Sequence, residues 1–184
     1  MSRLIQVVLI SISVALTGCS LFTPIEQTVP NLVLLAPVAG TPTQVLKQGV
    51  TFKKHEQEKQ FIAITRFTEQ QTKLVALLPT GQSFLYLEYD GQNFKEKNEA
   101  GIELPSKDIL AMIQFTLWPE GKVKESYPSN LGWRVEISPN LRSLYYKAQL
   151  RLKVELNGDK TNITNYADDY QVNIDTFEKE ELAQ

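Results

Sequence analysis

One segment near the C-terminal end of the chain alternates strictly between two kinds of side chain. Every even-numbered residue of Ala148–Leu156 is apolar, and the residues between them are Gln, Arg, Lys and Glu. Successive side chains of a β-strand point to opposite faces, so this pattern predicts a strand with one dry and one wet face. Such strands are typical of antiparallel sheets that cover a core on one side only.

Further runs of the same kind predict that the rest of the chain also forms antiparallel strands. Asp90-Gly91 and Asn157-Gly158 are two-residue hairpin signals, and Glu178–Glu181 follows the last expected strand as an acidic tail. The strands are expected near Val50–Lys53, Phe61–Phe67, Thr72–Leu78, Ser83–Tyr89, Asn93–Lys97, Trp133–Ser138, Leu141–Lys147 and Tyr170–Ile174.

One convincing helix is expected between the two sets of strands, at about Ser106–Leu117. Pro105 and Ser106 form its start, Asp108 lies in its first turn, and Trp118-Pro119 ends it because proline cannot continue a helix. Its second half is apolar on nearly every side rather than along one stripe. A helix of this kind has to be covered on most of its surface.

These elements predict a mainly β fold with a helix, of the α+β class. A twisted sheet that curls around its dry side encloses a concave apolar space, and the helix fits inside that curve. Two outcomes remain open. The helix fills the space and makes an ordinary core, or it fills only part of the space and leaves room for an acyl chain.

Composition and motifs exclude several classes of function. The 184 residues carry a net charge of −2 and lack a long basic run, which argues against nucleic acid as a partner. His55 is the only histidine and sits in a charged stretch, and no nucleophile motif or phosphate-binding loop is present. We therefore expect no enzymatic activity, no cofactor and no metal site.

The N-terminus has the layout of a secretory signal. Arg3 precedes an apolar run from Leu4 to Leu16, and Leu16–Cys19 resembles the lipobox of bacterial lipoproteins. The resemblance implies cleavage between Gly18 and Cys19, acylation of Cys19, and, because Ser20 is not aspartate, sorting to the periplasmic face of the outer membrane. Several acyl chains together hold a domain firmly at a bilayer.

The expected organisation is a signal peptide at 1–18, a lipidated cysteine and tether at 19–45, and one domain at 46–184. The tether is rich in proline, which favours extended backbone. Within it Leu32–Leu35 is apolar, and we expect this segment to dock on the domain rather than on a membrane or a client.

Several short motifs, taken in order, resemble a family of uncharacterised Gram-negative outer-membrane lipoproteins distantly similar to LolB, the lipoprotein-insertion receptor. Relatives of this kind are associated with aryl polyene biosynthesis clusters. The motifs are the lipobox, Leu35-Ala36-Pro37, Leu78-Pro79-Thr80-Gly81-Gln82, Tyr89-Asp90-Gly91, Leu104-Pro105, Trp118-Pro119 and Leu131-Gly132-Trp133.

The resemblance implies a LolA/LolB-like incomplete antiparallel β-barrel with a helix over an apolar cavity. It also implies a lipidic cargo, either acyl or polyene chains or lipoproteins, for delivery to the outer membrane. One feature departs from LolB, because the tight Leu78–Gln82 turn has no bulky apolar tip to insert into a bilayer.

The sequence therefore supports two hypotheses. In the first, a monomeric lipoprotein binds apolar cargo in its cavity. In the second, a structural lipoprotein with a filled core docks an envelope-protein partner. For the first hypothesis the expected lining residues are Leu150, Leu152, Val154, Ile113, Leu117, Trp118, Phe84 and Tyr86.

Overall fold

The computed structural model describes residues 30–37, 39–40, 43–99 and 101–182. The signal peptide, Gly18 and Cys19 lie outside the described residues, so the expectations about them stay predictions. Asn31–Gln184 form one compact unit, and everything below concerns that unit.

A single ten-stranded antiparallel sheet makes up most of this unit. The strand order is β5-β4-β3-β2-β1-β10-β9-β8-β7-β6, so β1 and β10 pair at its centre and join two meanders. The mainly β fold with helices, predicted from the alternating patterns, is confirmed. The strands are β1 (Gln44–Lys54), β2 (Gln57–Phe67), β3 (Thr72–Leu77), β4 (Ser83–Tyr89), β5 (Phe94–Asn98), β6 (Trp133–Ser138), β7 (Leu141–Tyr146), β8 (Gln149–Asn157), β9 (Lys160–Asn165) and β10 (Tyr170–Glu181).

The expectation of an acidic tail after the last strand was wrong. Glu178–Glu181 continue β10 and pair with Gln44–Lys47 of β1. A bulge at Phe177 shifts the register there, and Lys47 Nζ lies 2.6 Å from Glu178 Oε2 across the pair. Glu178 thus lies opposite a lysine on an exposed strand end, and such opposite-charge pairs stabilise neighbouring strands.

Both hairpin signals mark turns, but only the second turn is a two-residue loop, and it lies one residue later than expected. Between β4 and β5 the loop has four residues, and the Asp90 carboxylate accepts hydrogen bonds from the backbone N–H groups of Gln92 and Asn93 at 2.9 and 2.7 Å. Between β8 and β9 the two loop residues are Gly158 and Asp159, because Asn157 still pairs with Lys160. The Asp90 side chain therefore shapes the β4–β5 turn. The left-handed backbone of Gly158 shapes the β8–β9 turn.

The helix α2 (Ser106–Leu117) has the expected bounds. Ser106 does not cap it, however, because its hydroxyl donates to Glu96 on β5 at 2.9 Å. The sequence pattern did not predict α3 (Glu120–Ser126) or the short 3₁₀-helix η1 (Ser129–Leu131), which follow Pro119 and Pro128. In α3 only Val123 is buried, so its apolar periodicity was too weak to detect.

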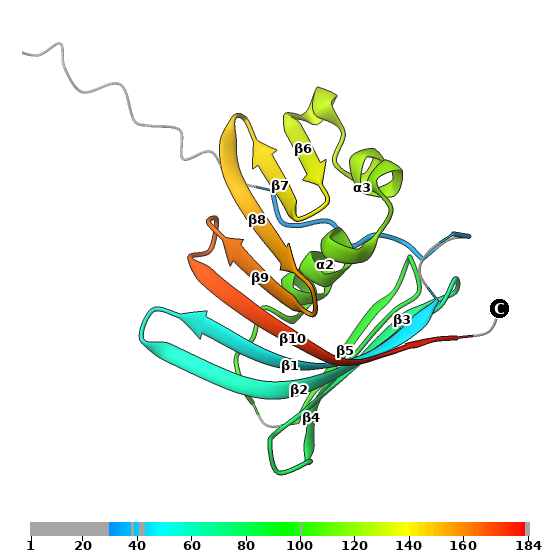
Figure 1. Ribbon diagram of the computed structural model, residues 1–184, viewed down its shortest axis with the longest axis vertical. Coiled ribbons are helices and arrows are strands. Elements are labelled where there is room, and N and C mark those ends of the chain that lie inside the picture. Colours follow the sequence, from blue (N-terminus) through cyan, green and yellow to red (C-terminus); the bar gives the residue numbers. More distant parts are fainter. Residues whose placement is uncertain (1–29, 38, 41–42, 100, 183–184) are drawn as a thin grey trace, which may run out of the picture. The chain divides into compact units, whose positions relative to one another are not determined.

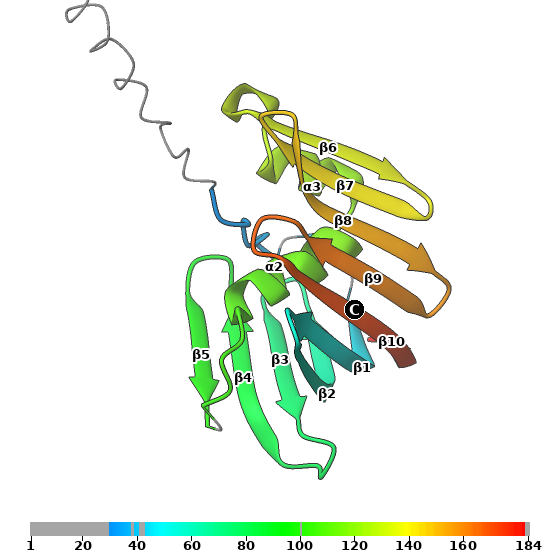
Figure 2. The ribbon, with the colours of Figure 1, turned by 90° about the vertical axis from the view of Figure 1, so that its left-hand side faces the viewer.

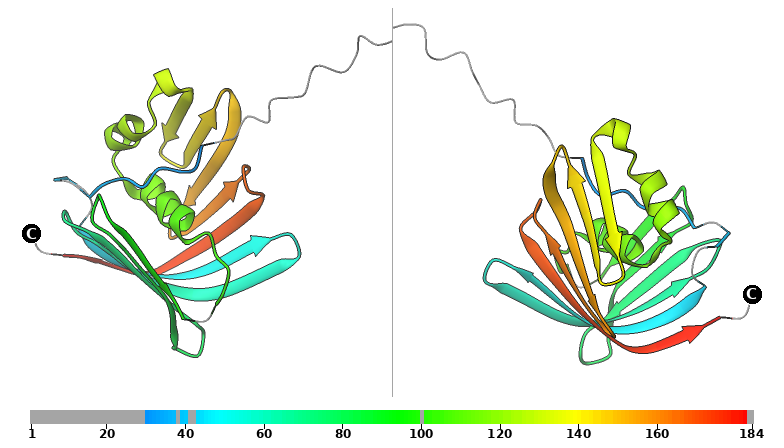
Figure 3. Two further views of the ribbon diagram at one scale, coloured as in Figure 1. Left: turned by 180° about the vertical axis from the view of Figure 1, so that it is seen from behind. Right: turned by 45° about the horizontal axis from the view of Figure 1, so that its top comes forward.

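Helix α2 lies on the concave side of the sheet. Strands β7–β9 pass on one side of it and β3–β5 on the other, as Figures 1 and 2 show and as Figure 3 repeats from two further sides. All residues from Ile109 to Thr116 are buried. This arrangement confirms the incomplete, curled sheet around an apolar helix, with β5 and β6 as its two edges.

Below α2 the interior is packed almost solid. The void between the helix and strands β1–β4, β9 and β10 measures about 10 Å³, which is roughly the minimum space that one water molecule needs. Phe67 packs edge-on against Trp118 at 5.3 Å, and Phe61 against Phe84 at 5.7 Å. The sequence left open whether the helix fills the curve of the sheet or leaves room for an acyl chain. Directly beneath the helix, the space is filled.

A strap formed by residues 31–37 covers the side of α2 that faces away from the sheet. Gln114 of α2, fully buried, accepts from the backbone N–H of Leu35 and donates to its carbonyl, both at 2.8 Å. The Tyr127 hydroxyl makes the same kind of pair with Val33, at 3.0 and 3.3 Å. The apolar sequence of this segment predicted that it docks on the domain, and these contacts confirm it.

The buried strand β8 generates the first testable prediction. Leu152 is fully buried in the core and Leu150 of the same strand is only half-buried. Leu152→Ala is expected to lower the free energy of unfolding by about 2–5 kcal/mol, as for other buried leucines. Leu150→Ala serves as the control, and chemical denaturation measures both. Equal losses at the two positions would contradict the packing described.

The strap gives a second prediction. Gln114→Leu keeps the side-chain volume but leaves the N–H and C=O of Leu35 without partners, each worth about 1–3 kcal/mol when buried. We expect a loss of stability of that order and earlier proteolysis of the strap. Gln149→Leu, on an exposed residue, is the matched control. An unchanged melting temperature for Gln114→Leu would show that the strap is not held by this residue.

Candidate functional site

A groove opens at one side of α2, where its C-terminal half meets the centre of the sheet. Its volume is about 190 Å³. The floor is apolar and the sides carry amides, hydroxyls and two charges, a mixture typical of small-molecule sites. The lining residues are Gln44, Leu46, Gln48, Ile113, Thr116, Leu117, Leu156, Gly158, Asp159, Thr161, Ile174, Thr176 and Lys179.

The groove is separated from the void beneath the helix by a shared wall. Ile113 of α2 and Ile174 of β10 line both the groove and the 10 Å³ void beneath the helix. Both side chains are nearly buried, at 5% and 6% exposure. A small displacement of α2 away from β10 would therefore join the groove to the space under the helix.

Two glutamines break the apolar alternation of β1 on its inward face. Gln44 and Gln48 are each 6% exposed, at positions equivalent to the buried Leu46 and Val50. Gln48 Nε2 donates to Thr176 Oγ1 on β10 at 2.8 Å, while its Oε1 is buried without a partner. Inward-facing amides on an otherwise apolar strand are the signal by which sequence reasoning could have found this groove.

The structure brings only two of the eight expected lining residues into the groove, Ile113 and Leu117. Leu152, Val154 and Trp118 are fully buried in the core. The expectation had not included Leu46, Gln48, Leu156 or Ile174, which supply most of the floor.

The remaining three expected residues lie away from the groove. Leu150 is half-buried near the end of β8. Phe84 occupies a bulge in β4, which explains why it and Leu85 are both buried although they are adjacent. Tyr86 lies on the outer face of the sheet, where its hydroxyl donates to Glu88 at 2.6 Å.

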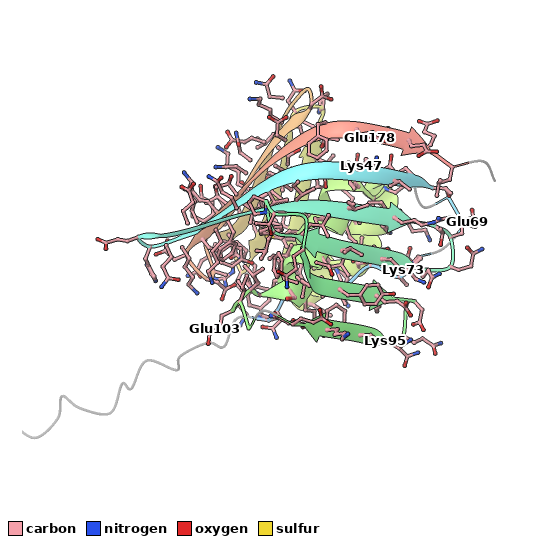
Figure 4. All side chains as sticks on the ribbon, turned by 90° about the horizontal axis from the view of Figure 1, so that it is seen from below. Lys47, Glu69, Lys73, Lys95, Glu103 and Glu178 are labelled. Atoms are coloured by element: carbon pink, nitrogen blue, oxygen red, sulfur yellow. The ribbon has the colours of Figure 1, made fainter. Side chains whose placement is uncertain are left out.

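The outer face of the sheet is a network of exposed charges. Tyr86, Lys95 and Lys73 surround Glu88, and these donors lower the pKa of its carboxyl to about 2. Figure 4 shows this face, with Lys73 and Lys95 on strands to either side of β4 and Lys47 beside Glu178. Exposed ion pairs of this kind add little stability individually and keep the face wet.

Larger hollows lie elsewhere on the described residues. One of about 550 Å³ lies where Gly49 interrupts the outer face, bordered by amides such as Asn162 and Asn173. Another, about 420 Å³, lies at the start of α2 beside Asp108 and Asp168. A third, about 340 Å³, lies beside β4 and is lined by the expected residues Phe84 and Tyr86 together with the charged side chains of Lys97 and Glu99.

In the described part of the chain, the side chains that could act in catalysis or bind a metal do not gather at one place. His55 is mostly exposed, with Asp169 3.7 Å away at the surface. Within the described ranges, no three His, Cys, Asp or Glu side chains are grouped closely enough to hold a metal ion. No helix in the described part of the chain is both long and apolar enough to cross a bilayer.

The carboxyl of Asp108 gives a prediction with a defined pH dependence. Burial, and then the nearby charge of Asp168, raise its pKa above the ordinary value of 3.8. A raised pKa means that ionisation opposes folding, so the ionised form destabilises the protein at neutral pH. We expect Asp108→Asn to raise the melting temperature at pH 7, and the gain to disappear as the pH falls below 3.8. A variant that melts at or below the wild-type temperature at pH 7 would contradict this.

Comparison with known proteins places the chain in a family. Among solved structures it is similar to a LolA superfamily protein of Nitrosomonas europaea, with 5% sequence identity over 82% of this chain and 90% of that one, and a TM-score of 0.38. No curated protein matches the chain significantly. The model of a family described as a protein of unknown function, DUF3261, matches residues 45–178. Since this match spans most of the chain, the protein belongs to the DUF3261 family.

Proposed function

We propose that the protein binds a lipidic cargo non-catalytically, in the groove beside α2. The observation that carries the proposal is an apolar floor of Leu46, Ile113, Leu117, Leu156 and Ile174, of which Ile113 and Ile174 also border the void beneath the helix. Burying apolar surface contributes about 25 cal/mol per Å², so capture needs no covalent step.

The groove as it stands is smaller than a typical ligand site, which spans about 300–1,000 Å³. A complete acyl chain therefore requires α2 to move away from β10, so that Ile113 separates from Ile174. In the structure α2 lies in the closed position. The filled space beneath the helix protects its apolar surface from water until cargo enters.

The setting of this activity is part of the proposal. With Cys19 acylated, the domain would be held at the periplasmic face of the outer membrane. The cargo would be acyl or polyene chains, or the acyl chains of lipoproteins, in keeping with the LolB-like lipoproteins that the sequence motifs resemble. The tight Leu78–Gln82 turn argues for acceptance of cargo rather than for insertion of lipoproteins into the bilayer.

A second candidate function is supported by the small void beneath α2. A domain whose interior is filled to within about 10 Å³ suits a structural lipoprotein that docks an envelope partner. In that case the open sheet edges, β5 and β6, are the surfaces available for pairing. The two functions differ in whether hydrocarbon enters the groove.

The test uses a fluorescent polyene fatty acid, titrated into the soluble domain, together with native mass spectrometry of the purified protein. Leu117 is half-buried in the groove, so Leu117→Glu places a charge on the apolar floor without opening the core. We expect this variant to lose at least tenfold in affinity, because a carboxylate beside the chain opposes its burial.

Leu78→Glu is the matched control, since Leu78 is also half-buried but lies outside the groove. It should bind like the wild type. If the wild-type protein neither carries extracted lipid nor binds the probe, cargo binding is wrong and the docking function takes its place.

A further inference from the structure

We propose that the cargo carries a hydrogen-bond donor, a hydroxyl or an amide N–H, next to its hydrocarbon chain, and that Gln48 accepts that hydrogen bond. This inference rests on the proposed function and deepens it. It names a class of amphiphile, hydroxylated or amide-linked acyl chains, in preference to plain fatty acids.

The first support is the state of the Gln48 side chain. Gln48 is 94% buried on the inward face of β1. Its Nε2 donates a hydrogen bond to Thr176 Oγ1 at 2.8 Å. With the amide in this orientation, Oε1 is an acceptor with no partner in the described part of the chain. Buried acceptors are nearly always paired, and an unpaired one on the lining of a groove indicates a partner that arrives with the ligand.

The second support is that this feature is specific to the groove. The other buried side-chain polar atoms without a partner belong to residues that do not line it. These residues are Thr43, Thr65, Thr72, Trp118 and Arg142. Thr116, which does line the groove, is satisfied because its hydroxyl donates to the Met112 carbonyl at 2.8 Å. Gln48 alone therefore combines burial, an unused acceptor and a place on the groove.

Charge and size narrow the class of ligand further. Lys179 and Asp159 both line the groove, so the two charges balance and no ionised head group is required. The volume of about 190 Å³ is below the roughly 300–1,000 Å³ of a typical ligand site. It fits a small neutral polar group with the first few carbons attached, while the remaining chain enters beneath α2.

The experiment compares two ligands that differ by one hydroxyl. Tetradecanoic acid and 3-hydroxytetradecanoic acid each displace the fluorescent polyene fatty acid from the protein, and the ratio of their dissociation constants is measured. We expect the wild type to favour the hydroxylated chain by about fivefold to tenfold, the effect of one neutral hydrogen bond. Gln48→Leu should reduce the ratio to about one.

Two further variants make the test independent of folding defects. Thr176→Val removes the hydroxyl that orients the amide and is expected to lower the ratio while the protein stays folded. Gln60→Leu, on the exposed outer face of β2, should leave the ratio unchanged. Thermal melts establish that each variant is folded before it is titrated.

The possible outcomes distinguish a failure of this inference from a failure of the proposed function. If both acids displace the probe equally from the wild type, or if Gln48→Leu keeps the preference, the role of Gln48 is overturned and cargo binding stands. If the probe does not bind the wild type at all, the proposed function itself fails.

Discussion

The structure depends on the burial of the central part of one helix, Ile109–Thr116, on all of its sides. Because α2 is apolar nearly all round, it has to be covered by the curled sheet on one side and by the strap on the other. The strap is not part of a strand, so its buried N–H and C=O groups need hydrogen-bond partners from side chains. Gln114 supplies the partners for both the N–H and the C=O of Leu35. One buried amide thus makes the two hydrogen bonds that a neighbouring strand would make, and this allows an irregular segment to cover the core.

Local signals predicted most of the fold. Alternation located every strand except β9 (Lys160–Asn165), for which no strand was predicted, and Pro105 and Pro119 marked both ends of α2. The errors arose where a long-range partner decides the structure. Glu178–Glu181 are strand because β1 lies beside them, and α3 is a helix although only Val123 is buried. Neither fact is encoded in the periodicity of its own segment, since pairing and docking supply the stability there.

The candidate site was less predictable than the fold. Sequence periodicity identified the dry faces, and hence Ile113 and Leu117, but packing assigned Leu152, Val154 and Trp118 to the core. How much volume remains between packed elements depends on interdigitation of side chains, which no pattern in the chain specifies. Gln48 is the opposite case, since a polar residue at an inward position conflicts locally with the fold, and such conflicts tend to mark functional sites.

The central pairing of β1 with β10 links residues from the two ends of the domain. Loop closure over so long a stretch is entropically costly, so the sheet should assemble late and slowly, after both meanders have formed. Until the last strand is available, β1 exposes an unsatisfied edge in the middle of the future sheet. A polypeptide synthesised from its N-terminus would remain vulnerable to aggregation and proteolysis until its final residues have left the ribosome.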